Sequence, residues 1–435
     1  MMTQNLFAAS QLLVLLLCFH SCTQERKENT GQKEFSYKQT NEVFEWRGAN
    51  RAGIYYEDGL LKSWPEGGPE LVWEYEGVGN GFGSPVFTPE NMYILGEIDN
   101  QAYLFAFDLE GNLLWKNDIG NEWVREYGGS RSTPTIVGDL IYATTGLGNL
   151  CCMDRDSGEK KWTVNMFSDL HGTFPSFGYS ESVVVADEKV FCNPGGIDTN
   201  VVALNCFTGD IIWTSKGAGE LHAYHSPLII KLNDRSVLAS FTAYELMGHD
   251  TETGQLLWKH DQNYVKPSKR VAGNDEAHSN AVLYENGFIY YATTGAGKGG
   301  VKLELAENGE KIREVWCNKA FDGFMGGIVK LGDYLYGCGT AKRGLKCINS
   351  TTGKTEKVLK IGNGAVIAAD GMLYYYNYAG DVFLISLEGK NMEVVSEFKI
   401  RKGSKEHFAH PVINNGKLYI RHGTVIQAFN IFDNL

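Results

Sequence analysis

Residues 201–213, VVALNCFTGDIIW, contain the pattern on which the fold depends. An alternating apolar run is followed by an Asn-x-x-x-Gly turn and a short run that ends on tryptophan, which is typical of a β-hairpin. Similar segments, each with a glycine turn and a closing tryptophan, recur at 104–115, 150–162, 246–258 and 303–316. A unit of this size cannot bury its own apolar face, so the repetition predicts an array of stacked sheets. The tryptophans that close the five units are Trp115, Trp162, Trp213, Trp258 and Trp316.

Eight segments resemble the opening strand of such a unit. They begin at Gly83, Ser132, Ser180, His225, His278, Gly326, Gly364 and His410. Successive tryptophans are roughly 50 residues apart, a spacing that suits four short antiparallel strands with their turns. The sequence therefore predicts eight four-stranded blades, with seven blades and a decorated end as the alternative.

The two ends of the repeat complement each other. The last unit reaches the C-terminus without a closing strand, whereas ELVWEY at 70–75, which contains Trp73, precedes the first unit as an extra strand. Pairing the two closes a ring and hides the sheet edges. We therefore predict an all-β, eight-bladed β-propeller over residues 44–435, closed by its N-terminal strand. We interpret the tryptophans, Trp73 included, as structural wedges between blades, replaced by Val358 in unit six and Phe398 in unit seven.

Composition limits the class of partner. The 435 residues are 43% hydrophobic and include 51 glycines against 10 prolines, as expected of a globular chain with many tight turns. The formal net charge is −12, which repels phosphate backbones and anionic lipid. We expect no nucleic-acid partner.

The N-terminus indicates export. Residues 7–19 form an apolar run of signal-peptide length, followed by Cys22 and a polar stretch. This resembles a bacterial lipoprotein signal, whose cysteine is acylated after cleavage. We predict a signal peptide at 1–21, a lipid-anchored flexible tether at 22–43, and a location in the periplasm or at the outer membrane of a Gram-negative bacterium. Membrane contact would be through the lipid only; a secretory signal without lipid is the alternative.

The repeat itself resembles a known family. The segments ALNCFTGDIIW (203–213) and GHDTETGQLLW (248–258) are similar to the propeller repeat of pyrroloquinoline-quinone (PQQ) dehydrogenases and their non-enzymatic relatives. Residues 46–74, 128–162 and 224–229 resemble a group of exported bacterial PQQ-like propellers. The resemblance also implies a fold shared with the lipoprotein of the outer-membrane barrel assembly machinery, which binds protein rather than quinone.

A dehydrogenase of this family would need a calcium ion held by carboxylate and amide oxygens, an aspartate base, an arginine and a stacked indole. The candidates Glu97, Arg131, Asp275 and Asn280 are scattered singly and equally suit structural roles. No C-x-x-C-H haem motif occurs. We therefore expect no cofactor, with PQQ and calcium as the alternative.

Cysteines are expected to be inert. Seven remain once Cys18 leaves with the signal and Cys22 carries lipid, and an odd number cannot pair completely. Adjacent Cys151 and Cys152 resemble the vicinal disulfide of some quinoprotein alcohol dehydrogenases. Their place in a repeated strand, where side chains alternate between faces, favours buried thiols instead.

Histidines form the polar set of most interest. His222, Tyr224, His225, His278, His407 and His410 lie at or just before opening strands, where a propeller exposes side chains to its central funnel. HAYH and HFAH space their histidines by three, which points the two to opposite faces of a strand and disfavours a chelate. Three readings stay open: packing between blades, a funnel site for a small molecule or glycan, and a metal held by several blades. The residues predicted for a funnel site, as acid/base or sugar-contacting groups, are His225, His278, His410, Arg131 and Tyr224.

The sequence thus favours a non-catalytic binding or scaffold module of the cell envelope. Its partner would be an envelope protein or a periplasmic small-molecule or glycan ligand. A PQQ-dependent dehydrogenase and a funnel enzyme acting on carbohydrate are the two alternatives.

Overall fold

The computed structural model describes residues 42–217, 220, 222–270, 280–295 and 297–433, all within the compact unit Lys38–Leu435. The predicted signal peptide, Cys22 and nearly all of the predicted tether lie outside these residues. Within them the only helical segments are two 3-10 turns, η1 (Ala49–Arg51) and η2 (Pro267–Lys269). None of the described helices has the length and apolar character needed to cross a membrane.

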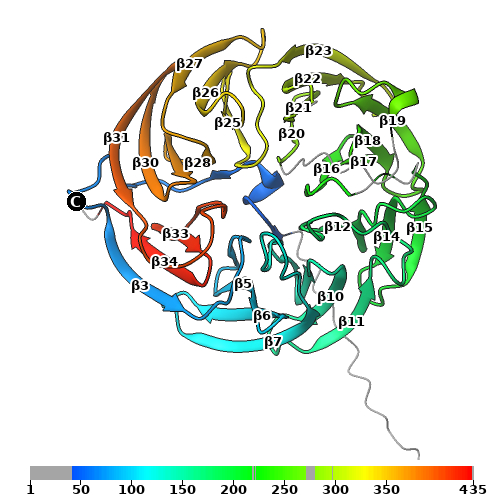
Figure 1. Cartoon of the computed structure of the whole chain (residues 1–435), viewed down its shortest axis with the longest axis horizontal. Coiled ribbons are helices and arrows are strands. Elements are labelled where there is room, and N and C mark those ends of the chain that lie inside the picture. Colours follow the sequence, from blue (N-terminus) through cyan, green and yellow to red (C-terminus); the bar gives the residue numbers. More distant parts are fainter. Residues whose placement is uncertain (1–41, 218–219, 221, 271–279, 296, 434–435) are drawn as a thin grey trace, which may run out of the picture. The chain divides into compact units, whose positions relative to one another are not determined.

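Eight sheets are arranged in a ring around a central axis (Figure 1). Blades one to four are β4–β7 (Val86–Phe87, Asn91–Ile98, Gln101–Asp108, Leu113–Asn121), β8–β11 (Thr135–Val137, Leu140–Thr144, Asn149–Asp154, Lys160–Asn165), β12–β15 (Val184–Ala186, Lys189–Cys192, Val201–Asn205, Ile211–Ser215) and β16–β19 (Leu228–Lys231, Ser236–Phe241, Glu245–Asp250, Leu256–Asp261). Blades five to seven are β20–β23 (Leu283–Glu285, Phe288–Ala292, Gly300–Leu305, Ile312–Asn318), β24–β27 (Ile328–Leu331, Tyr334–Gly339, Gly344–Asn349, Thr355–Leu359) and β28–β31 (Gly364–Ala369, Met372–Asn377, Asp381–Glu388, Asn391–Lys399). Blade eight contains β32–β34 (Val412–Asn414, Lys417–His422, Val425–Asn430) and, from the other end of the chain, β3 (Glu70–Glu76).

Ring closure follows the prediction. Strand β3 pairs antiparallel with β34, with Glu74 opposite Gln427, and so supplies the outermost strand of blade eight (Figure 1). The eight-bladed all-β propeller and its closure by an N-terminal strand are therefore confirmed, and each predicted opening segment leads into the inner strand of one blade.

A buried arginine reinforces the seam between the last blade and the first. Arg421 of β33 is fully buried and donates to the carbonyls of Gly423, Gly83, Leu95 and Gly79 at 2.6 to 3.1 Å. Three of these carbonyls belong to the beginning of blade one. Burial lowers the pKa of Arg421 to about 9. The guanidinium therefore joins the two ends of the ring through neutral carbonyl oxygens.

The repeated tryptophans lie between neighbouring blades. Four of them donate from the indole nitrogen to a carbonyl of the next blade at 2.9 to 3.1 Å: Trp162 to Cys206, Trp213 to Thr251, Trp258 to Gly309 and Trp316 to Ser350. The repeated glycine makes room for this contact, because a Cβ built on Gly254 would stand 2.5 Å from the Trp213 ring and one on Gly353 would stand 2.6 Å from the Trp316 ring. The tryptophan of one unit and the glycine turn of the next are thus a single packing element.

The two expected replacements for tryptophan were placed wrongly. In the tryptophan hairpins the indole residue pairs directly beside a β-bulge, and in blades six and seven Lys357 of β27 and Ser396 of β31 occupy that position. Val358 is 41% exposed, whereas Phe398 is buried two residues beyond that position. In blade seven the indole comes from Trp64, whose amide donates to Ser396 at 2.8 Å and whose ring packs edge-on against Phe398.

Substituting Gly254 with alanine should lower the free energy of unfolding by about 2–4 kcal/mol, because the new methyl group would overlap the Trp213 ring. The matched control is Gly371→Ala. Gly371 has φ +75°, close to the +72° of Gly254, but has no atom within 4 Å of its Cβ position. Urea denaturation of both variants isolates the tryptophan contact, and equal losses would show that the wedge contributes nothing.

His249 of β18 gives a pH-dependent prediction. It is fully buried, neither ring nitrogen has a hydrogen-bond partner, and burial lowers its pKa to about 4. Below about pH 6.5 the imidazole binds a proton in the unfolded chain, whereas in the folded protein it stays neutral down to about pH 4. The free energy of unfolding therefore decreases as the pH falls from 6.5 to 4. His249→Leu should therefore stabilise the protein by about 2 kcal/mol more at pH 5 than at pH 7. The exposed His171→Leu is the control; a gain at His249 that is independent of pH would contradict the argument.

Candidate functional site

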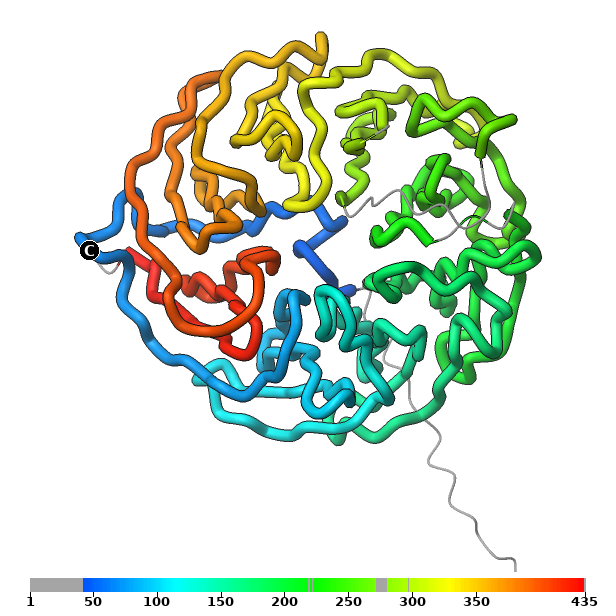
Figure 2. The backbone as a smooth tube through the Cα atoms, viewed as in Figure 1, coloured from blue at the N-terminus to red at the C-terminus, as the bar shows by residue number. Residues whose placement is uncertain are grey.

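A short N-terminal segment crosses the centre of the ring. Residues 43–55, which we call the strap, contain β1 (Val43–Phe44), η1 and β2 (Ile54–Tyr55). Strand β1 pairs with the inner strand β8 of blade two, and β2 pairs with the inner strand β28 of blade seven. Figure 2 shows this dark-blue segment running across the middle of the propeller. The strap therefore obstructs the central channel.

Two buried arginines hold the strap. Arg47 donates to the carbonyls of Ile328 and Val366 at 2.8 and 3.0 Å and to Nδ1 of His410 at 2.8 Å, which reaches blades six, seven and eight. Arg51 donates to the carbonyls of Ser182 and Val183 of blade three, both at 2.7 Å, and pairs with Glu45. The strap is thus bound on opposite sides of the ring.

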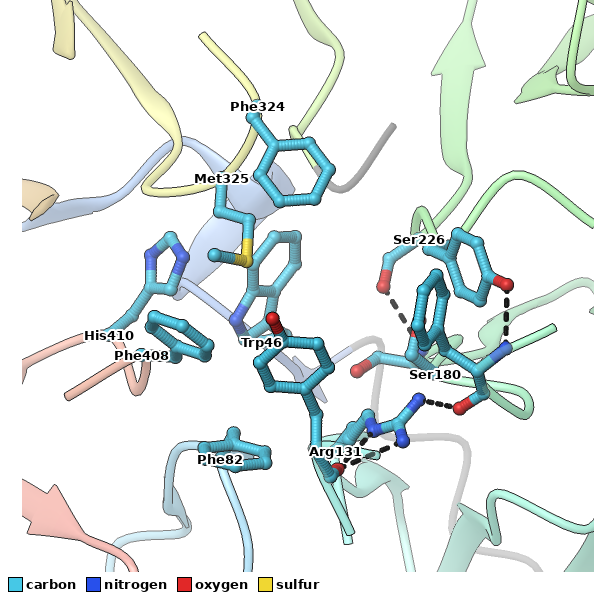
Figure 3. Close-up of a pocket in the computed structure, with 13 residues that line it drawn as sticks. Trp46, Phe82, Arg131, Ser180, Ser226, Phe324, Met325, Phe408 and His410 are labelled. Carbon is cyan, nitrogen blue, oxygen red and sulfur yellow. Dashed lines mark hydrogen bonds between the residues drawn. The ribbon is translucent and has the colours of Figure 1, made fainter. Parts of the chain in front are cut away.

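Beside the strap lies a cavity of about 330 Å³. It is lined by Trp46 of the strap and by residues of the loops that precede six inner strands: Phe82, Tyr127, Arg131, Phe177, Ser180, Ser182, Tyr224, Ser226, Phe324, Met325, Phe408 and His410. In Figure 3, Phe82, Phe408 and the adjacent Phe324 and Met325 lie around the cavity on three different loops, and Trp46 lies between them. The cavity is therefore open on the side of the ring where the inner strands begin.

The strap reaches the cavity from the other side. Val43 pairs with Val137 at the end of β8, and Phe44 pairs with Ile136, one residue nearer the beginning of that strand. The strap therefore runs along the channel toward the loop that carries Arg131. Trp46 follows β1 and forms the floor of the cavity. The Trp46 ring meets that of His410 edge-on, with centroids 5.1 Å apart.

The aromatic residues of the mouth form a continuous belt. The ring centroid of Phe408 lies 5.5 Å from that of Phe82 and 6.1 Å from that of Tyr127. The ring centroid of Phe177 lies 5.9 Å from those of Tyr127 and Tyr224. Of these rings, Tyr127 is 51% exposed and Tyr224 is buried. A partly exposed aromatic cluster of this kind marks an interaction site.

The backbone of the belt is strained at two tyrosines. Tyr127 and Tyr224 have φ values of +53° and +49°, a region that costs a bulky residue about 1–3 kcal/mol. A buried carboxylate holds the loop of Tyr127 in place, because Glu122 accepts hydrogen bonds from the Trp123 amide and the Ser130 hydroxyl, both at 2.8 Å. Burial raises the pKa of Glu122. The loop is therefore built around a buried polar anchor.

The structure brings three of the five predicted funnel residues, Arg131, Tyr224 and His410, to the cavity. His225 is not in the lining; it is buried, and its Nε2 accepts from the Phe241 amide at 3.2 Å. His278 and the dehydrogenase candidate Asp275 lie outside the described residues. The predicted set is therefore only partly assembled.

The polar lining groups are engaged in holding the site. The Arg131 guanidinium donates to the carbonyls of Tyr127, Glu126 and Phe177, and burial lowers its pKa to about 10 (Figure 3). The Tyr224 hydroxyl accepts from the Phe177 amide at 2.9 Å. Burial, and then the neighbouring Arg47, lower the pKa of His410 well below its usual value, so His410 is a neutral acceptor for Arg47. Arg131 and Tyr224 therefore hold the loops of the mouth in place, and His410 helps to hold the strap.

The other candidate residues have structural partners. His222 lies 2.9 Å from the Asn193 carbonyl, and His407 stacks on His422 with ring centroids 3.7 Å apart. Glu97 accepts from Asn80 and from the Asn100 amide. Asn280 bonds to carbonyls of blades five and six and accepts from the Gly327 amide. Among the described residues, no three His, Cys, Asp or Glu side chains gather as a metal site.

Cys151 and Cys152 lie in β10, and all seven cysteines from Cys151 onward are free thiols in the structure. Cys152 pairs with Trp162 across the hairpin, and burial raises its pKa to about 12. The pair thus occupies an ordinary blade strand remote from the cavity lining.

Comparison with known proteins agrees with this architecture. Residues 100–359 match the family described as outer membrane protein assembly factor BamB. The chain belongs to this family. BamB of Shewanella oneidensis is 25% identical over 204 residues, which cover 46% of this chain and 47% of the relative. A quinoprotein ethanol dehydrogenase of Pseudomonas aeruginosa is 26% identical over 158 residues, which cover 33% of this chain and 24% of the dehydrogenase.

The chain thus matches between about a quarter and about a half of the length of these curated relatives. The crystal structure of BamB from Moraxella catarrhalis aligns with a TM-score of 0.59 and 13% identity, over 83% of this chain and 99% of that chain. At this identity the likeness shows the fold alone.

Reasoning from sequence missed most of the lining. Apart from Tyr224, the aromatic residues were not predicted, because each, taken singly, is typical of a core position. A signal was present: in six units an aromatic residue stands one to five positions before the opening strand, as Phe82, Tyr127, Phe177, Tyr224, Phe324 and Phe408. Because those openings meet at one mouth, the recurrence indicates an aromatic belt.

Proposed function

We propose that the protein is an exported, lipid-anchored propeller of the cell envelope that binds a partner protein without catalysing a reaction. The observation that carries the proposal is the chemistry of the cavity. Its described lining is largely aromatic, and its basic groups Arg131 and His410 are bonded to the protein itself. Such a surface offers apolar contact and presents no carboxylate and no unbonded imidazole.

The naming of the relatives supports a protein partner. The family and the Shewanella oneidensis relative are described as outer membrane protein assembly factors. An assembly factor acts through other proteins, and an exposed aromatic cluster is typical of protein-binding surfaces. We therefore place the partner among envelope proteins, with the aromatic mouth as the contact.

The alternative of a PQQ dehydrogenase fits the lining poorly. Calcium requires carboxylate and amide oxygens, and the described lining residues include neither. Glu122 and Glu181, two of the carboxylates in the loops that carry the lining, are buried and accept from the amides of Trp123 and Asn193. Trp46 could supply a stacked indole, but Arg131, the arginine of the lining, donates to backbone carbonyls. The described residues do not form a PQQ–calcium site.

The alternative of a carbohydrate enzyme lacks a supporting observation. Glycoside hydrolysis generally uses a pair of carboxyl groups on either side of the bond to be cleaved. The described lining of the cavity contains no such pair. The aromatic rings alone would bind a sugar without hydrolysing it.

Photo-cross-linking in the native host tests the proposal. A benzophenone amino acid placed at Tyr127, on the mouth, should link the protein to one discrete envelope protein. The same probe at Tyr56, which is 83% exposed and lies just after β2 at the far end of β28, should not. Equal labelling at both positions, or none at Tyr127, would count against a partner at the mouth. Calorimetry with PQQ and Ca²⁺ should show no binding; micromolar binding would favour the dehydrogenase.

A further inference from the structure

The cavity has the size and chemistry of a socket for one side chain. We propose that it takes an uncharged aromatic side chain presented by an extended segment of the partner protein. This rests on the proposed function and adds to it the chemical class of the group recognised. Three features of the cavity support the proposal: its volume, the lack of an available charged partner, and the way the strap fills the other side of the channel.

The volume suits a single large side chain. About 330 Å³ is at the lower end of the range of ligand pockets, which run to roughly 1,000 Å³. An aromatic side chain buries roughly 150–250 Å² and prefers edge-to-face or offset contacts with other rings. Six aromatic residues other than Tyr224 line the cavity from different directions, namely Trp46, Phe82, Tyr127, Phe177, Phe324 and Phe408. Met325 adds a flexible, polarisable contact that adapts to the shape of a ring (Figure 3).

The electrostatics disfavour a charged group. The lining contains one charged side chain, Arg131, which already donates to three carbonyls and lies near the buried Glu122. A cationic side chain would meet the guanidinium and find no carboxylate in the lining. An anionic side chain would share Arg131 with the carbonyls that it already binds. Either charge would lose its water for at most a shared partner, so a neutral group is favoured.

The strap shows how the channel receives an extended segment. From the far side, β1 adds to the edge of β8 and carries Trp46 to the cavity, where its ring packs against His410. A partner segment would approach from the open side and place its own ring against the belt above Trp46. Main-chain pairing with a side-chain anchor is a common mode of peptide recognition. The strap thus forms half of a socket whose other half is the belt.

The test uses acetylated tripeptide amides of the form Gly-X-Gly, with X as Trp, Phe, Ala, Glu or Lys, and chitobiose as a glycan. Saturation-transfer NMR against the full folded protein measures Kd. The Trp and Phe peptides should bind at least tenfold more tightly than the Ala, Glu and Lys peptides. Equal binding of all five, or preferential binding of chitobiose, would overturn the inference.

Variants connect the binding to the cavity. Phe408→Ala should weaken the Trp peptide at least tenfold, whereas Phe207→Ala, which removes a 36% exposed phenylalanine from a blade-three turn, should not. If Phe408→Ala fails to fold, Ser180→Trp fills the cavity without removing a core ring and should abolish binding. Unchanged affinity in the filled variant would place the peptide elsewhere and overturn the inference.

The two proposals fail separately. If Tyr127 cross-links to one envelope protein but the five peptides bind with equal Kd, the aromatic socket is overturned and the partner-binding function stands. Loss of the cross-link as well would overturn both.

Discussion

Replacing Arg421 with methionine is expected to lower the free energy of unfolding by about 4 kcal/mol. The side chain is fully buried, and its four hydrogen bonds end on carbonyls of Gly423, Gly83, Leu95 and Gly79. Methionine keeps most of the volume but leaves those carbonyls without a donor, at about 1–3 kcal/mol each. The relief of burying a charge offsets part of that loss. The net effect is large because one side chain serves four acceptors on both sides of the seam.

Guanidinium denaturation of Arg421→Met and of Arg401→Met measures this effect. Arg401 is exposed in the segment that leads to blade eight, so its loss should change stability by less than about 0.5 kcal/mol. Because Arg421 connects blade eight with blade one, its loss should weaken the whole propeller in a single transition. A variant as stable as the parent would mean that the seam does not depend on these bonds.

Replacing Arg47 with methionine is expected to open the channel locally. Arg47 holds the strap to Ile328, Val366 and His410, yet no blade depends on it for its own strands. Three lost bonds to buried acceptors reduce the free energy of strap opening by about 3 kcal/mol, equivalent to roughly 100-fold faster amide exchange. The amides of Arg51 and Gly53, which bond within the strap, should report it.

Hydrogen exchange with mass spectrometry distinguishes the local effect expected at Arg47 from the global effect expected at Arg421. In Arg47→Met, peptides covering 43–55 should exchange faster while those covering β16 to β19 are unchanged; the exposed Arg343→Met should alter neither. Since Trp46 is the floor of the cavity, the aromatic peptide should also lose affinity. Uniform acceleration across all blades would show that the strap is part of the global fold rather than a separate element.

The sequence made the ring predictable because its signals are periodic. Each Asp/Asn-x-x-x-Gly turn and each tryptophan repeats the same packing against the next blade, and the unpaired strand near Trp73 complemented the incomplete last unit. The repeat was misapplied at Val358, because Lys357, not Val358, stands as far from Asn349 as Trp213 does from Asn205.

The strap and the buried arginines were not predictable in the same way. Strands of two residues such as β1 and β2 carry no period, and their partners β8 and β28 lie far along the chain. Arg47 and Arg421 resemble surface arginines in the sequence, because they bond mainly to carbonyls and have no acidic partner as a signal. The histidines attracted attention because their chemistry is versatile, whereas the structure assigns the cavity to aromatic residues.

The aromatic mouth depends on β3 completing blade eight, because a closed ring brings the six aromatic loops together. Glu74 and Gln427 are directly opposed in β3 and β34, and their side chains are 3.2 Å apart. A Glu74→Cys/Gln427→Cys protein, with the exposed Cys317 changed to serine, should form the 74–427 disulfide under mild oxidation. The bond should raise the unfolding midpoint by constraining a very long loop, as mapped by mass spectrometry and denaturation. Thiols at 74 and 427 that stay reduced in the folded protein would contradict the closed ring.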